Sequence, residues 1–253
     1  MLKFSDANAK IEALYNVEAI RPFLKDRSVY SLDLLSGWSC PFAKDCLSKA
    51  IIVDGKRKIK DGPHTQFRCF SASQEVTFTN VYLSRKHNFD TLRPIKTTEQ
   101  MVAEIESSMP ADLGVCRIHV AGDFFNQDYF DAWIEIANRN PDRLFYAYTK
   151  SLEYWVNRKN LIPNNFILTA SRGGRLDNLI EEYKLRSSTV VFSVQQAEQL
   201  GLDIDHTDEF AANPSMKNTN FALLIHNTQP KGSKAAKALQ ELKKSGTKFS
   251  YAR

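Results

Sequence analysis

The chain has 253 residues, of which 43% are hydrophobic and 25% charged, and its formal net charge at pH 7 is +5. This length fits one α/β domain, and the apolar content can bury a core without disulfide staples. Four cysteines in so long a chain argue against a secreted disulfide framework, and the sequence shows neither a signal-peptide core nor an apolar run of about 18 residues. We expect a cytoplasmic protein with reduced thiols and no membrane contact, whose mild basic excess permits a nucleic-acid partner.

The first convincing strand, Val29–Leu35, runs into a loop that contains Cys40 and Cys46. Cys69 follows, with 22 residues between it and Cys46. This intervening segment, 47–68, is predicted to be an inserted basic hairpin, because apolar and basic stretches flank an Asp-Gly turn. A solvated ribbon is the ordinary role of such a segment.

Residues 71–109 are predicted to be a helical insertion of two helices, the second capped by Thr97 or Thr98. No linker or repeat divides the chain, so 1–253 is expected to be a single α/β domain. Beyond the insertion, short apolar strands alternate with helical stretches. The strands are expected at 116–122, 144–149, 166–170, 189–194 and 221–226, and the helices at 127–139, 152–159, 176–183, 196–200 and 234–244.

With Val29–Leu35, these segments make six strands in β-then-α order, which is typical of a parallel sheet. Six units are fewer than the eight of a closed barrel. A partial parallel (β/α)6-type barrel and a doubly wound sheet both fit, and we favour the partial barrel. In either fold the functional site lies at the carboxyl ends of the strands.

Cys40, Cys46 and Cys69 form an incomplete set of soft ligands near the end of the first strand. Three thiolates can hold a [4Fe-4S] cluster or zinc with one position open. The irregular spacing also allows cysteines that bind no metal. Cys116 differs, because alternation along its strand places it on an apolar face, where it is expected to be a buried core thiol.

Arg117 and His119 share the other face of that strand, so His119 is predicted to line the site. Gly122 and Asp123 follow at the carboxyl end, where a glycine lets a ligand approach the backbone and a carboxylate can receive an amine. A Ser-Arg-Gly-Gly-Arg turn that begins at Ser171 opens a helix, and Arg172 is a candidate for binding a carboxylate or phosphate. A plain strand-to-helix turn is the alternative.

The order of first strand, cysteine loop and a second strand ending in Gly-Asp resembles the radical S-adenosylmethionine barrel. In that family three cysteines bind a [4Fe-4S] cluster, and a turn after the second strand holds the methionine amine. The resemblance implies that Cys40, Cys46 and Cys69 are cluster ligands and that Gly122 and Asp123 match part of the second motif. The cysteines here stand farther apart in sequence than in that family.

Three further segments are similar in sequence to a phage and plasmid domain family known as gene product eighty-eight. They are Ser-Gly-Trp-Ser-Cys-Pro at 36–41, Arg-Ile-His-Val-Ala-Gly-Asp-Phe at 117–124 and Phe-Tyr-Ala-Tyr-Thr-Lys-Ser at 145–151. The resemblance covers roughly residues 28 to 230 and implies a phage-type protein in the host cytoplasm, without implying a reaction.

The sequence therefore predicts an iron–sulfur protein with one [4Fe-4S] cluster, whose open iron can bind a small molecule such as S-adenosylmethionine. Whether it is an enzyme stays open, and no catalytic residue is assigned. One rival is a non-enzymatic protein in which a cluster or zinc braces a basic surface for nucleic acid or a host protein. Another is a degenerate barrel that keeps the cluster for redox sensing or electron transfer.

Overall fold

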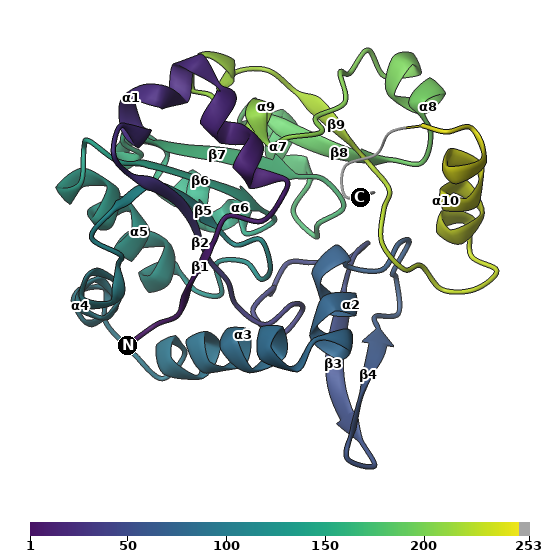
Figure 1. Cartoon of the computed structure of the whole chain (residues 1–253), viewed down its shortest axis with the longest axis horizontal. Coiled ribbons are helices and arrows are strands. Elements are labelled where there is room, and N and C mark those ends of the chain that lie inside the picture. The colour runs from purple at the N-terminus through teal and green to yellow at the C-terminus, as the bar shows by residue number, and fades with distance from the viewer. Residues whose placement is uncertain (248–253) are drawn as a thin grey trace.

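The computed structural model describes residues 1–247, so the last six residues of the predicted domain lie outside the described part. Its centre is a seven-stranded sheet in the order β1-β2-β5-β6-β7-β8-β9 (Figure 1). Six strands are parallel, and β1 pairs antiparallel with β2 at one edge. The strands are β1 (Phe4–Asp6), β2 (Ser28–Leu32), β5 (Leu113–Ile118), β6 (Leu144–Thr149), β7 (Phe166–Ser171), β8 (Ser187–Val191) and β9 (Phe221–Leu224).

The predicted parallel α/β class is confirmed, because all six expected strands form and lie side by side in chain order. The order does not reverse, as it does at the switch point of a doubly wound sheet. Strand β1 was not predicted, since three residues, two of them exposed, give too short a pattern to recognise. No helix within residues 1–247 is long and apolar enough to cross a bilayer.

Helices connect the strands and cover both faces of the sheet. The predicted helices at 127–139 and 234–244 have the bounds found in the structure, and the others differ at their ends. The helices are α1 (Arg21–Leu24), α2 (Phe70–Thr77), α3 (Thr79–Leu92), α4 (Thr98–Ser108), α5 (Gln127–Arg139), α6 (Leu152–Asn157), α7 (Asn178–Glu182), α8 (Val194–Gln199), α9 (Glu209–Ala212) and α10 (Lys234–Lys244), with short 3-10 helices η1 (Ile11–Asn16), η2 (Glu18–Ile20), η3 (Lys159–Leu161) and η4 (Pro214–Met216).

Alternate residues of each strand enter different cores. On one face, Cys116 and Ile118 of β5 pack with α3, α4 and α5. On the other, Val115 of β5 packs with the N-terminal segment and α9. Cys116 is fully buried on the helix-covered face, where strand alternation predicted it. The N-terminal cover over the second face was not predicted from the sequence.

The two predicted insertions lie on one side of the sheet (Figure 1). The predicted hairpin is formed by β3 (Ser48–Val53) and β4 (Lys56–Asp61), and its turn residues Asp54 and Gly55 both have positive φ, as an Asp-Gly hairpin turn requires. The helical insertion contains three helices rather than two, because Phe78 has extended backbone and separates α2 from α3. Thr97 caps α4 through its hydroxyl, which accepts the amide of Gln100.

Candidate functional site

A cavity of about 630 Å³ lies at the carboxyl ends of the parallel strands. Residues at or just beyond the ends of β5, β6, β7 and β9 line it, as parallel α/β folds predict. Cys40, Cys46 and Cys69 all line this cavity, together with Gly122 and Asp123. With His119, which also lines it, the cavity brings together six of the seven predicted site residues.

The three cavity cysteines come from two segments of the chain. Cys40 and Cys46 belong to the loop after β2, and Cys69 is the N-cap residue of α2. All three are free thiols and partly buried. Cys116, also a free thiol, is absent from the cavity wall and lies on the other face of β5.

Backbone N–H groups point at two of the sulfur atoms. The amide of Gly37 donates to Cys40 Sγ at 3.3 Å. The amides of Ser71 and Ala72, in the first turn of α2, donate to Cys69. Such donors favour negative charge on sulfur, which is the form in which a cysteine binds a metal.

Without a metal, the three thiols keep their protons at neutral pH. Burial raises the pKa of Cys40 well above its usual value, and the nearby Asp123, Cys69 and Cys46 raise it further. Burial raises the pKa of Cys46 to about 11 and also raises the pKa of Cys69. Within residues 1–247, no group of three or more Cys, His, Asp or Glu side chains is arranged to hold a single metal ion.

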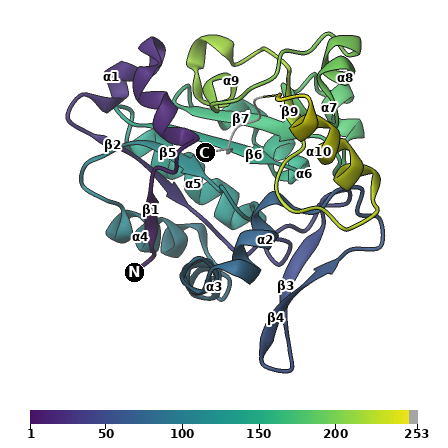
Figure 2. The ribbon, with the colours of Figure 1, turned by 45° about the vertical axis from the view of Figure 1, so that its right-hand side comes forward.

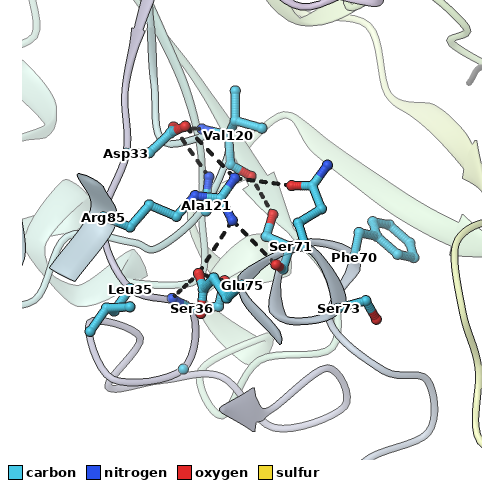
Figure 3. A network of polar contacts seen from close by, with 12 residues as sticks. Asp33, Leu35, Ser36, Phe70, Ser71, Ser73, Glu75, Arg85, Val120 and Ala121 are labelled. Atoms are coloured by element: carbon cyan, nitrogen blue, oxygen red, sulfur yellow. Dashed lines mark hydrogen bonds and ion pairs between the residues drawn. The ribbon is translucent and has the colours of Figure 1, made fainter. Parts of the chain in front are cut away.

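A buried ionic network holds the cysteine loop against α2 and the end of β5 (Figure 3). Arg85 of α3 contacts Glu75 at 3.3 Å and Asp33 at 3.8 Å. Glu75 accepts both the amide and the hydroxyl of Ser36, at 2.9 and 2.7 Å. Asp33 accepts the amide of Val120 at 2.7 Å. These contacts join the segments that carry Cys40, Cys69 and Asp123.

Gly122 owes its identity to packing within the protein. Its φ is +95°, and a Cβ there would meet Ser39 Oγ at 2.6 Å and Leu34 Cβ at 2.7 Å. Only glycine therefore allows the turn after β5 to lie against the cysteine loop. The sequence predicts a glycine here that lets a ligand approach the backbone, whereas in the structure two protein segments meet at it.

Asp123 is buried, and burial raises its pKa to about 6. Its Oδ1 accepts the hydroxyl of Thr149 at 2.6 Å and the amide of Phe124 at 2.8 Å. Its Oδ2 accepts the amide of Lys150 at 2.8 Å. Because each carboxylate oxygen can accept two hydrogen bonds, Oδ2 retains one acceptor position among the described contacts.

His119 does not follow the strand alternation that predicted its position. Strand β5 ends at Ile118, and His119 has a positive φ of 70°, which turns its side chain away from the face of Arg117. Its Nε2 lies 3.1 Å from the hydroxyl of Tyr129 in α5, and its ring packs edge-on against Phe124. Burial lowers its pKa to about 3, so the imidazole is neutral. It borders the cavity from the helix side.

Among residues 1–247, Arg172 is not one of those that line the cavity. Its guanidinium contacts Glu181 at 2.6 Å and Ser187 at 3.2 Å. In the same turn, the amides of Gly173 and Gly174 donate to the carboxylate of Asp177 at 2.8 and 2.9 Å. The position expected to bind a ligand anion is thus occupied by a carboxylate of the chain itself.

This Arg172–Arg175 turn instead supports the cysteine loop. The carbonyl of Gly173 accepts the amide of Asp45 at 2.9 Å, and the amide of Arg175 donates to the carbonyl of Phe42 at 2.9 Å. The loop residues that form these bonds, Phe42 and Asp45, lie between Cys40 and Cys46 in sequence. The turn therefore fixes the stretch of chain that separates the first two thiols.

Lys150 lines the cavity, although it is not among the predicted site residues. Its Nζ donates to Ser171 O, Ser171 Oγ and Arg172 O at 2.7–2.8 Å, which uses all three of its protons. The fixed ammonium lowers the pKa of Cys46 and of Asp123, although burial dominates both. The available signal was the polar Thr-Lys-Ser sequence at the end of β6.

A second buried polar cluster, here called the acid–base cluster, also borders the cavity, through Lys10, Arg117 and Tyr148. Asp208 contacts Lys10 Nζ at 2.6 Å and also pairs with Arg117. The hydroxyls of Tyr146 and Tyr148 donate to the same carboxylate at 3.1 and 3.2 Å. Neither Lys10 nor Asp208 was predicted, because they meet across a large sequence separation.

The family model described as Gene product 88 matches residues 2–244. The chain belongs to the Gene product 88 family. This member is similar to the Gene 88 protein of Mycobacterium phage L5, with 32% identity over 90 residues. The match covers 32% of this chain and 38% of the phage protein, just over a third of that protein's length.

The resemblance to this family that the sequence motifs predicted is therefore confirmed, and the relative is a phage protein. No solved structure matches the chain. The description of the family names neither a cofactor nor a reaction.

Proposed function

We propose that this protein holds one [4Fe-4S] cluster through Cys40, Cys46 and Cys69 and binds a small ligand in the adjoining cavity. The observation that supports the proposal most strongly is the convergence of three free thiols from two segments on one cavity. The fourth cysteine, Cys116, packs in the core on the other face of β5. Core packing alone gives no reason for three of the four cysteines to line the same cavity.

The chemistry of the donor set fits an iron–sulfur cluster. Three thiols are soft ligands, and amide donors already point at Cys40 and Cys69. A bound cluster with one iron free of cysteine would supply one-electron chemistry and a coordination position for a ligand atom. Because the thiols are protonated without metal, assembly would release protons and be favoured by rising pH.

The cavity also supports a ligand beside the cluster. Its volume of about 630 Å³ lies within the range of small-molecule sites, roughly 300–1,000 Å³. Asp123 Oδ2 has one acceptor position left for an amine, and the rigid turn after β5 fixes its orientation. Strands in uninterrupted chain order agree with a partial (β/α)6 barrel of the radical S-adenosylmethionine type, which makes S-adenosylmethionine the first ligand to test.

The test of the ligand is electron paramagnetic resonance of the reduced, anaerobically purified protein with and without S-adenosylmethionine. We expect the ligand to change the spectrum of the wild-type protein. In Asp123→Asn, iron content should stay unchanged while about ten- to a hundredfold more ligand is needed, since one charge-assisted hydrogen bond is lost. Glu198→Gln, which removes an exposed carboxylate on α8 that does not line the cavity, is the matched control.

A wild-type spectrum that saturating S-adenosylmethionine does not change contradicts S-adenosylmethionine as the ligand, whereas the proposal of a cluster is unaffected. Zinc in place of iron in the purified protein contradicts the cluster and supports the rival in which a metal only braces the loop. Loss of iron in Asp123→Asn would assign Asp123 to holding the cysteine loop rather than to binding a ligand.

A further inference from the structure

The β3–β4 hairpin extends away from the body of the protein in both views (Figure 1, Figure 2). Its inner face packs on the helical insertion. Arg57 donates to the hydroxyl of Thr79 at 2.7 Å and lies over the ring of Tyr82, 5.3 Å from its centroid. Side chains alternate along each strand, so the residues between Arg57 and its inward neighbours belong to the opposite, outer face.

Four lysines dominate that outer face, which we call the lysine face. The register pairs Lys49 with Lys60, Ile51 with Lys58 and Val53 with Lys56. Lys56, Lys58 and Lys60 are exposed. Within residues 1–247, one of these lysines forms an ion pair: Lys58 Nζ lies 3.9 Å from the carboxylate of Asp54 at the tip of the hairpin.

Such a face is unfavourable for the isolated hairpin. Lys49 and Lys60 are directly opposite, and like charges in that position destabilise a sheet. Successive lysines on β4 stand about 7 Å apart, at two residues per step. A polyanion with regularly spaced charges would relieve the repulsion and release its own counterions.

Trp38 adds a flat aromatic surface next to these charges. Its side chain belongs to the cysteine loop and is 48% exposed. Its indole N–H donates to the carbonyl of Ala50 in β3 at 3.1 Å, which fixes the ring beside the hairpin. Lys49 Nζ lies 4.4 Å from the ring centroid. An exposed large aromatic residue held in one orientation is a platform on which a base can stack.

We propose that the lysine face and Trp38 together form a binding site for single-stranded nucleic acid. The lysines contact successive phosphates, and Trp38 stacks on an unpaired base. A single strand fits better than a duplex, because the bases of a duplex are already stacked and offer no free face to the indole. The site does not depend on the cluster, although the hairpin lies between Cys46 and Cys69 in sequence.

The experiment is fluorescence anisotropy of the full-length protein with a labelled 20-nucleotide oligo(dT), titrated at several salt concentrations. The variant Lys56→Gln/Lys58→Gln/Lys60→Gln should reduce the slope of log K against log[salt] by about 2, since each phosphate contact to a single strand contributes about 0.7. The control Lys234→Gln/Lys237→Gln/Lys244→Gln removes the same charge from exposed positions on α10 and should leave the slope unchanged.

Trp38→Leu should weaken oligo(dT) binding about tenfold and leave the salt slope unchanged, because stacking carries no charge. A duplex of the same length should bind more weakly than the single strand. Equal losses in the two triple variants would overturn the proposal in favour of non-specific attraction. Unchanged oligo(dT) binding with aggregation of the hairpin variant would overturn it too, and would show that the lysines only keep this exposed hairpin from pairing with other copies.

Discussion

Two buried polar clusters border the same cavity, and they differ in how far the chain satisfies its own groups. In the acid–base cluster, the carboxylate of Asp208 meets the ammonium of Lys10, the guanidinium of Arg117 and two tyrosine hydroxyls. In the thiol cluster, formed by Cys40, Cys46 and Cys69, backbone amides donate to Cys40 and Cys69, and the neighbouring cysteines raise the pKa of Cys40. In the first cluster the chain itself supplies the partners of the buried carboxylate, whereas in the second the three sulfur atoms can still bind a ligand.

The largest expected effect comes from breaking the acid–base cluster. Asp208→Asn should lower the free energy of unfolding by about 3–5 kcal/mol, because it removes the buried anion that Lys10 and Arg117 share. Denaturant unfolding measures the change. The control Asp142→Asn removes the anion from an exposed pair with Arg27 and should cost less than about 1 kcal/mol. Equal losses in the two variants would contradict the distinction.

The thiol cluster can be tested through its protons. Burial raises the pKa of Cys46 to about 11, so its thiolate is scarce at neutral pH. In metal-free protein we expect iodoacetamide to modify Cys46 about a hundredfold more slowly at pH 7 than an ordinary cysteine with a pKa near 9, since only the thiolate reacts. The rate should keep rising up to about pH 11. Mass spectrometry follows the reaction, and a plateau near pH 9 would contradict the raised pKa.

The network behind the thiols should respond to loss of its planar guanidinium. Arg85→Lys keeps the charge but cannot reach Glu75, Asp33 and the carbonyl of Ser71 together. We expect a loss of about 1.5–3 kcal/mol in unfolding free energy and faster alkylation of Cys40. Arg93→Lys, at the exposed end of the same helix, is the control. An unchanged alkylation rate would show that the network does not hold the cysteine loop.

The smallest effect is expected at the cysteine outside the cavity. Cys116→Ala removes one buried sulfur from the helix-side core and should cost about 1 kcal/mol through the small void it leaves. Thermal unfolding measures it. A loss several times larger would mean that Cys116 has a structural role that its packing does not reveal.

Much of the fold was predictable because period-two apolar patterns and helical patterns alternate clearly from β5 onward. The helix at 127–139 shows this best, with an asparagine cap and a strongly apolar face. The N-terminal segment was missed because its short 3-10 turns have no sustained period, and their value comes from covering the second face of the sheet.

The site was predictable where it depends on position along strands and fails where it depends on backbone conformation or distant partners. The convergence of the cysteines and Asp123 follows from strand order. His119 lines the cavity, but a positive φ ends the strand alternation one residue early, so its ring contacts Tyr129 and Phe124. The role of Arg172 was missed because Asp177 fills its turn, and no local pattern announces that contact.

Iron and acid-labile sulfide analysis of anaerobically purified protein tests the central claim most directly. We predict about four iron and four sulfide atoms per chain in the wild type and in Cys116→Ala, and loss of both in Cys40→Ala, Cys46→Ala and Cys69→Ala. The three cavity thiols would then be the ligands. An iron-free wild type, or a Cys116→Ala variant that loses iron while the cavity variants keep it, would contradict the account.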